Sequence, residues 1–237
     1  MKKLLTIAVA SIAVAAAADS YSPSIGVTSI SLSKKNNVIP VQFNSLATSG
    51  NVTAGELVCT NNIPLHSHLY VYDNGYTAWE LQETGWVGLN VVASTAADDI
   101  TYSGNATAKS LSAGSAIWLS FPAATVLPIT VAVYGKVAES ASTEIAVGAS
   151  NAPKSTLICN PTSSSVALAD KVSSLSLAKG DTIQPLGATF SGNYVYSGSS
   201  WTKIEEGKIT QNATLPSLAQ YTGCWFVSKG GSGTITW

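Results

Sequence analysis

The chain has 237 residues, a formal net charge of −1 at pH 7, and basic residues that are all lysine. Arginine supplies the bidentate contacts to phosphates and guanine edges, so this composition argues against a nucleic-acid-binding protein. Only 11% of the residues are charged, whereas serine, threonine, alanine, glycine and valine abound. That balance favours an extracellular protein that packs against neighbours or sugars over a cytosolic enzyme.

Residues 1–18 have the pattern of a bacterial secretory signal peptide. Lys2 and Lys3 precede an apolar stretch at residues 4–15, and alanines at residues 16–18 suit cleavage before Asp19. The alternative is an uncleaved membrane anchor, which would need about 20 apolar residues. We therefore expect a secreted or cell-surface protein with no transmembrane span in the mature chain.

The rest of the chain shows patterns typical of short strands. They are expected at residues 27–32, 38–43, 69–72, 76–79, 86–92, 116–121, 129–134, 156–159, 194–196, 201–204, 224–228 and 234–237. The strongest signal is the hairpin around Asn74-Gly75, since Asn-Gly supplies the positive φ values that tight turns need. A single helical turn is expected at residues 52–57, capped by Asn51 or Thr53. Short strands at roughly ten-residue intervals predict an all-β fold built as a sandwich or barrel.

The second half of the chain repeats the first half. Three similar pairs of segments occur in the same order: Leu57-Val58-Cys59 and Leu157-Ile158-Cys159, Tyr70-Val71-Tyr72 and Tyr194-Val195-Tyr196, and the apolar runs that contain Trp118 and Trp225. Such a repeat predicts two related units, in which Cys59 would superpose on Cys159 and Trp118 on Trp225. The stretch at residues 137–153 is the expected junction. We predict a first β domain at residues 19–150 and a second at residues 151–237, joined in one rigid body.

The second copy also resembles a known group of proteins. Its elements Asn160-Pro161-Thr162, Gly180-Asp181-Thr182-Ile183, Trp225-Phe226-Val227-Ser228-Lys229-Gly230 and Thr234-Ile235-Thr236-Trp237 are similar to those of small exported bacterial β-domain proteins. In that group an NPT element and a GxGFWYxSKG…TITW element recur, commonly in one or two copies per chain. The resemblance covers most of residues 25–237 and departs at Cys224, where an aromatic residue is usual. It implies β architecture and export, and it transfers no site residues because no activity is established for the group.

Three cysteines in an exported protein allow one internal disulfide at most. Cys159 and Cys224 lie in runs that could be neighbours in one sheet, so they are the best candidate pair. The alternative is that Cys59, Cys159 and Cys224 are all small buried hydrophobes.

The candidate metal pattern is His66-Ser67-His68, because residues i and i+2 of a strand share a face. Asp73 or Glu80 would complete such a site. The alternative is a pair of solvated loop histidines, favoured by Pro64 and by the lack of an equivalent pair in the second copy. We expect no metal and no cofactor.

The sequence does not present a catalytic set. The paired acids Asp98-Asp99 and Glu205-Glu206 would point to opposite faces of a strand, so neither pair can share a substrate. Neither a nucleophile elbow nor the companion motifs of serine β-lactamases occur, and a Ser-His-Asp triad is improbable with two histidines in one loop. We expect that the protein is not an enzyme.

The aromatic residues give the candidate ligand-binding site. Trp79 and Trp201 follow turns and, with Tyr72 and Tyr196, could form a platform for sugars; half-buried packing is the alternative. Trp118 and Trp225 lie inside apolar runs and are predicted core residues.

These patterns predict a structural or interaction protein of a bacterial surface layer, filament or matrix. Its expected partner is itself or another surface protein, bound through strand edges at residues 38–41 and 144–147, where Pro40 suits an edge. The alternative is a carbohydrate-binding protein with a polysaccharide partner. A third candidate is a glycoside hydrolase whose acids come from unrelated strands.

Overall fold

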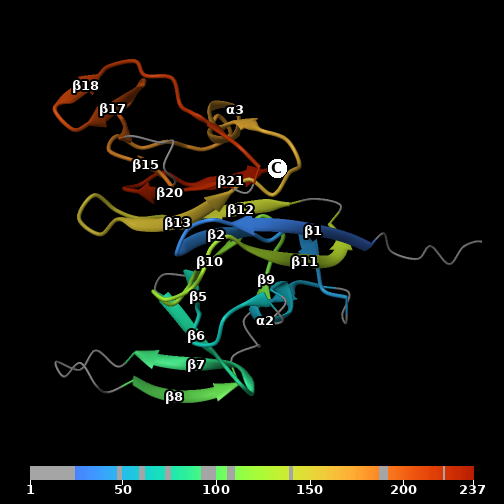
Figure 1. Ribbon diagram of the computed structural model, residues 1–237. Coiled ribbons are helices and arrows are strands. Elements are labelled where there is room, and N and C mark those ends of the chain that lie inside the picture. The colour runs from blue at the N-terminus through green and yellow to red at the C-terminus, as the bar shows by residue number, and fades with distance from the viewer. Residues whose placement is uncertain are drawn as a thin grey trace, which may run out of the picture.

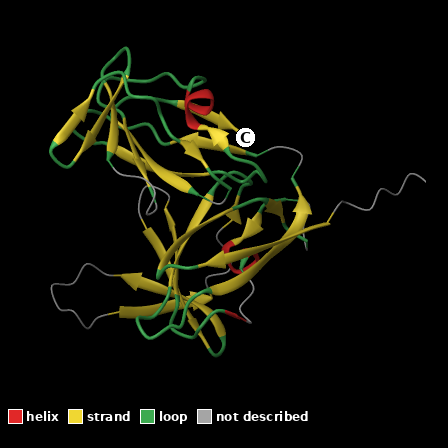
Figure 2. Cartoon of the chain, turned by 45° about the horizontal axis from the view of Figure 1, so that its top comes forward, coloured by secondary structure: helices red, strands yellow, loops and turns green. Residues whose placement is uncertain are grey.

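The computed structural model describes residues 25–46, 50–58, 62–72, 76–91, 100–105, 110–138, 141–186, 192–220 and 222–237. The proposed signal peptide at residues 1–18 lies outside these residues. The described chain consists mainly of antiparallel strands with two single-turn helices (Figure 1 and Figure 2). The prediction of an all-β, sandwich-like fold is confirmed, and none of the described sheets closes into a barrel.

The first unit contains a six-stranded sheet, a three-stranded sheet and a small two-stranded sheet. The six-stranded order is β2-β10-β5-β6-β7-β8, and the three-stranded order is β1-β11-β3. In chain order the elements are β1 (Ile25–Leu32), β2 (Asn36–Pro40), β3 (Phe43–Asn44), β4 (Val52–Thr53), α2 (Ala54–Leu57), β5 (His68–Tyr72), β6 (Tyr76–Gln82), β7 (Gly85–Val91), β8 (Ile100–Asn105), β9 (Ser110–Leu111), β10 (Ala116–Ser120) and β11 (Ile129–Val137).

Alternation along the strands builds the first core. In β5, Leu69 and Val71 are buried, whereas the side chains between them point to the other face. Ile117 and Leu119 of β10 also face inward and are fully buried. Residues of the six-stranded and three-stranded sheets meet in one hydrophobic cluster, so the core lies between the two sheets.

The predicted helical turn is confirmed as α2. Thr53 is its N-cap, and its hydroxyl accepts a hydrogen bond from the backbone N–H of Glu56. The Glu56 carboxylate in turn accepts from the Thr53 N–H at 2.8 Å. This reciprocal pair is the capping box that the sequence indicates.

The second unit has the same organisation. Its six-stranded order is β13-β20-β15-β16-β17-β18, beside the pairs β12-β21 and β14-β19. The elements are β12 (Ser142–Ile145), β13 (Lys154–Cys159), β14 (Val166–Ala167), α3 (Leu168–Val172), β15 (Thr182–Pro185), β16 (Asn193–Tyr196), β17 (Trp201–Glu205), β18 (Lys208–Thr210), β19 (Ser217–Leu218), β20 (Gly223–Ser228) and β21 (Gly233–Thr236).

The two strand orders correspond one to one. The sheet β2-β10-β5-β6-β7-β8 matches β13-β20-β15-β16-β17-β18, the pair β4-β9 matches β14-β19, and β1-β11 matches β12-β21. A single-turn helix follows β4 in one unit and β14 in the other. The predicted duplication is therefore confirmed. Strand β3 has no counterpart among the described residues of the second unit.

The proposed alignment of the copies is wrong in two places. Cys159 lies in β13, which matches β2, and its register partner Gly223 matches Ala116, so the residue equivalent to Cys159 is Pro40. Cys59 itself lies outside the described residues, after α2. The two Tyr-Val-Tyr runs lie in β5 and β16, which are not equivalent strands. Alternating aromatic and β-branched residues suit any strand, so their similarity does not establish equivalence.

Strand β12 lies inside the expected junction but completes the second unit. It pairs with the C-terminal strand β21, and Ile145 belongs to the second hydrophobic core. The indole N–H of Trp237 donates to the Thr143 hydroxyl at 2.9 Å. The second unit is therefore closed by a strand that comes before β13 in the chain, just as β1 precedes β2.

Candidate functional site

Trp118 and Trp225 occupy equivalent positions in the two sheets. Trp118 lies opposite Val38 on one side and Tyr70 on the other. Trp225 lies opposite Leu157 and Gln184 on the matching strands. The predicted equivalence of the two tryptophans is confirmed by this register.

The same two tryptophans contact each other across the junction of the units. Their ring centroids are 6.5 Å apart and the ring planes differ by 25°. Tyr72 packs edge-on against Trp225 with centroids 5.2 Å apart. Contact between equivalent residues is what an approximate two-fold relation between similar units produces.

A small apolar cluster holds the junction together. Ala116, Leu157 and Cys159 are buried in it, and Val38 and Leu186 pack around them. Figure 1 shows the contributing strands β13 and β20 lying over β2 and β10. Each of these side chains projects from the sheet face that points away from its own unit's core.

The prediction that Trp118 and Trp225 are core residues is therefore wrong. Both are half-buried and lie at the junction, because the alternate positions Ile117 and Phe226 face the cores. Each run is apolar at successive positions because one face of its strand meets the core of its own unit and the other face meets the opposite unit.

Aromatic side chains continue from the junction across the first sheet. His68, Tyr70 and Tyr72 follow one another at alternate positions of β5, and the rings of His68 and Tyr70 are 6.0 Å apart. Burial raises the pKa of Tyr70 above its ordinary value. A hollow of about 260 Å³ is lined by Tyr70, Trp118 and the polar side chains Asn36 and Ser120.

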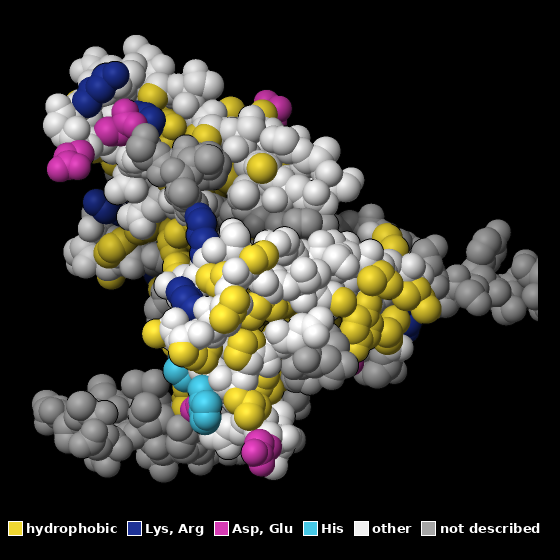
Figure 3. All heavy atoms as spheres, in the orientation of Figure 1, with side chains coloured by type: hydrophobic (Ala, Val, Ile, Leu, Met, Phe, Trp, Pro, Cys, Tyr) yellow, Lys and Arg dark blue, Asp and Glu magenta, His cyan; other side chains and the backbone are white. Residues whose placement is uncertain are grey.

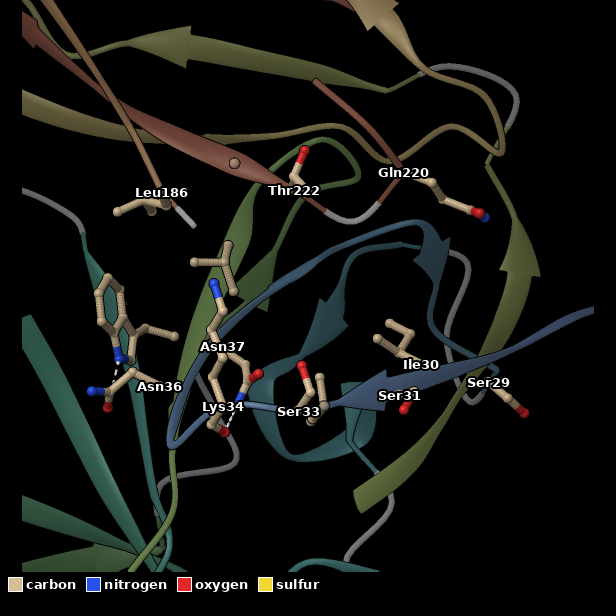
Figure 4. Close-up of a pocket in the computed structure, with 14 residues that line it drawn as sticks. Ser29, Ile30, Ser31, Ser33, Lys34, Asn36, Asn37, Leu186, Gln220 and Thr222 are labelled. Carbon is tan, nitrogen blue, oxygen red and sulfur yellow. Dashed lines mark hydrogen bonds between the residues drawn. The ribbon is translucent and has the colours of Figure 1, made fainter. Parts of the chain in front are cut away.

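A larger groove of about 640 Å³ runs between the two units (Figure 4). One side is formed by β1, β2 and the turn that joins them, and the other by residues of the second unit. Figure 4 shows Asn36 and Leu186 toward one end and Ser29 and Gln220 toward the other. Its lining comprises Ser29, Ile30, Ser31, Leu32, Ser33, Lys34, Asn36, Asn37, Val38, Trp118, Leu186, Gln220, Thr222 and Gly223.

Two hydrogen bonds orient side chains along this groove. The indole N–H of Trp118 donates to Asn36 Oδ1 at 3.5 Å. The Asn37 amide donates to the Lys34 carbonyl oxygen at 2.7 Å. Trp118 thus contacts Asn36 through its indole N–H and Trp225 through its ring.

The four predicted ligand-binding residues lie in three separate places. Trp79 is 4% exposed and belongs to the first core, so the expectation of an exposed ring is wrong; it follows the turn but points inward in β6. Trp201 and Tyr196 face each other with centroids 5.3 Å apart, and Trp201 packs on the second core. Tyr72 alone reaches the junction, where it contacts Trp225. Neither Tyr70 nor Trp118 belonged to the predicted set.

The two histidines do not share a strand face as the pattern predicts. His66 lies in a turn with φ of 64°, pairs with the Glu80 carboxylate and is 74% exposed, whereas His68 lies in β5. Among the described residues, no group of three histidine, cysteine or acidic side chains is arranged to hold a metal ion. Asp73 lies outside the described residues.

The described acidic pair, Glu205-Glu206, does not converge on a common site. Glu205 pairs with Lys203 at 2.7 Å, and Glu206 follows in an exposed turn. Asp98-Asp99 lies outside the described residues.

The two described cysteines are free thiols. Cys159 faces the junction, whereas Cys224, on the neighbouring strand, faces the second core. Side chains on opposite faces of a sheet cannot be joined by a disulfide. The proposed Cys159–Cys224 disulfide is therefore wrong, and both residues follow the alternative of small buried hydrophobes.

A second surface feature lies on the ribbon formed by β1 and β11. Ile25 and Val27 are 66% and 69% exposed, and Tyr134, the register partner of Val27, is 40% exposed. Figure 3 shows hydrophobic side chains gathered at this side of the molecule. Within the described sheets β1 pairs with β11 alone, so β1 is an edge strand. We call Ile25, Val27, Tyr134 and this edge the β1 surface.

Comparison of the chain with family models, curated proteins and solved structures finds no match. In the described part of the chain, the helices are too short and too polar to cross a membrane.

Proposed function

We propose that the protein is an exported structural or interaction protein that assembles with copies of itself through the β1 surface. The observation that carries this proposal is the eight-residue edge strand β1 with its exposed Ile25 and Val27. Edge strands with unpaired N–H and C=O groups are templates for pairing with another chain.

The composition of β1 supports the same proposal. The strand carries glycine, serine, threonine and aliphatic residues and no charged side chain. Natural monomers commonly place lysine or proline on such edges to prevent pairing. In the second unit the edge strand β18 carries Lys208 beside its exposed Ile209, so this protection is present there.

An antiparallel pair of β1 strands would satisfy two-fold symmetry. Each copy would then offer the same surface to the other, which is the commonest arrangement in homodimers. Exposed apolar side chains of both copies would be buried together, in agreement with the use of such patches as interaction sites.

Both expected edge segments lie partly in strands at a sheet edge, since β2 ends the six-stranded sheet and β12 belongs to a two-stranded sheet. Val41 and Ile145, however, are buried in the cores. A lysine substitution at Val41 or Ile145 would therefore disrupt a core, so it could not serve as a test of assembly. The exposed positions of β1 are the ones to change.

Sedimentation velocity at micromolar concentration tests the proposal. The protein should form multimers, and Val27→Lys should shift the distribution toward the monomer by placing like charges in the paired surface. Ile209→Lys is the matched control, because Ile209 is 70% exposed on an edge strand of the other unit. A monomeric parent protein, or an equal effect of both lysines, would overturn the proposal.

A further inference from the structure

The groove between the units is lined by polar and aromatic side chains that the proposed self-assembly does not use. It lies along the second half of β1 and reaches β2 and the second unit, whereas the β1 surface begins at Ile25. Its volume of about 640 Å³ falls within the range of ligand sites, which is roughly 300–1,000 Å³. We propose that this groove binds a segment of a neutral polysaccharide, with Trp118 as the stacking platform.

The polar side chains of the lining match a polyol. Serine and threonine hydroxyls and the amides of Asn36, Asn37 and Gln220 can each donate and accept hydrogen bonds. Sugar hydroxyls also do both, so they can satisfy such groups as water leaves the groove. An apolar ligand would displace water from the serine hydroxyls of the lining without offering hydrogen bonds in return, at a cost that disfavours its binding.

The charge of the groove excludes other ligand classes. Lys34 is the one charged side chain among the fourteen described residues that line it. Without a guanidinium or a second cation, the lining has little to hold a phosphate or polyanion. Without a carboxylate in this lining, it also lacks the pair of acids that glycoside hydrolysis needs. These features favour binding of an uncharged glycan without its cleavage.

Trp118 supplies the apolar part of the site. Its half-buried ring borders both the groove and the adjoining hollow beside Tyr70. A pyranose ring has a face of C–H groups and a rim of hydroxyls, so it can lie on an aromatic face while the rim reaches polar neighbours. The Asn36 hydrogen bond and the contact with Trp225 hold the indole in place before any ligand arrives. Preorganisation of this kind reduces the entropy lost on binding.

The second unit differs at the corresponding place. Tyr70 and Tyr72 of the first sheet correspond to Gln184 and Leu186 of the second sheet. The first sheet therefore has two tyrosines beside its tryptophan, whereas the second sheet has a glutamine and a leucine at these positions. One glycan site per chain is expected from this asymmetry.

Affinity electrophoresis tests the inference with defined probes. The protein is run in native gels that contain hydroxyethyl cellulose, laminarin, galactomannan or soluble starch, with alginate as an acidic comparison. At least one neutral polymer should retard the protein, and Trp118→Ala should weaken that binding about tenfold. Asn36→Ala should weaken the binding less, because it removes the hydrogen bond to the indole N–H but keeps the Trp118 ring.

Controls separate ring loss from damage to the junction. Trp118→Phe keeps a ring against Trp225 and should retain more binding than Trp118→Ala. Ile209→Ala removes an exposed apolar side chain outside both the groove and the β1 surface, and it should bind like the parent protein. The inference fails if no neutral polymer retards the protein, if alginate alone does so, or if Trp118→Ala and Asn36→Ala bind as the parent protein does. Because none of these variants alters a residue of the β1 surface, this outcome is independent of the assembly test.

Discussion

His66 in the first unit and Gly180 in the second lie at the same point of the same turn. The N–H of His66 donates to the Leu81 carbonyl oxygen, and the N–H of Gly180 donates to the equivalent carbonyl oxygen of Tyr196, both at 2.8 Å. Both residues have positive φ, 64° and 95°. The turn geometry is thus retained in both copies, while the residue that adopts it differs.

Gly180→Ala should destabilise the protein. A side chain in the left-handed region costs on the order of 1–2 kcal/mol, and the added methyl would lie 3.1 Å from Lys229 Cδ. Urea unfolding measures the loss. Gly50→Ala is the control, since it has open space and no positive φ; an equal loss in both variants would contradict the explanation.

Gly223→Ala should destabilise the pairing of β20 with β13 beside the junction. The new Cβ would lie 2.6 Å from the Ile158 carbonyl oxygen and 3.4 Å from Val38 Cγ1. Backbone cannot move aside cheaply, so we expect a loss of about 1–3 kcal/mol in thermal or urea unfolding. Ala116→Gly makes the reverse change at the equivalent position and should cost less, about 0.5–1 kcal/mol. A Gly223→Ala variant as stable as the parent protein would mean that β13 and β20 can move apart at this position without cost.

Asp181 connects two segments of the second unit, the turn before β15 and the turn between β20 and β21, and should be essential to the stability of this unit. Its buried carboxylate accepts hydrogen bonds from the N–H groups of Ala178 at 2.8 Å, Lys229 at 2.7 Å and Gly231 at 3.3 Å. Asp181→Ala leaves these donors without a partner and should cost about 3 kcal/mol or more in urea unfolding. Ser67→Ala at the equivalent buried position should cost about 1 kcal/mol, because the Ser67 hydroxyl donates one described hydrogen bond, to the Pro64 carbonyl oxygen. Equal losses of stability in the two variants would show that the Asp181 carboxylate contributes no more than the Ser67 hydroxyl.

The two single-turn helices provide a paired test of capping. Thr53 caps α2 through its side chain, whereas Ala167 at the start of α3 makes no such bond. Thr53→Ala should lower stability by about 1 kcal/mol, and Ala167→Ser should raise it by up to about 1 kcal/mol. Chemical unfolding of both variants measures the difference. A loss of stability in Ala167→Ser would indicate that its pairing with Ser217 matters more than the cap.

Local patterns predicted most of the strands, because burial of one face imposes alternation on β1 and β5. They missed α3, whose N-cap Ala167 provides no capping signal. They could not assign Trp118 to the junction, because Ala116, Ile117 and Leu119 make the run apolar on both faces. The groove was also beyond local patterns. It combines Ser29, Trp118 and Gln220, which the fold brings together from distant parts of the chain.

The cysteines give the last prediction, which concerns alkaline pH. Burial raises the pKa of Cys224 to about 12 and the pKa of Cys159 well above its usual value of 9.0. In the unfolded chain both thiols ionise near their ordinary pKa, so the folded state binds more protons between about pH 9 and pH 12. Stability that is complete below pH 9 should therefore fall as the pH rises through this range.

Urea unfolding at pH 7, 9 and 10.5 measures this loss, and a thiol reagent at pH 8 checks burial directly. Cys159 and Cys224 should react only when the chain unfolds, since the thiolate is the reactive form. Cys224→Ala should reduce the pH dependence, while its stability at pH 7 falls because of the lost packing. A pH dependence unchanged in the Cys224→Ala variant, or rapid reaction of Cys224 in the folded protein, would contradict the buried placement of this thiol.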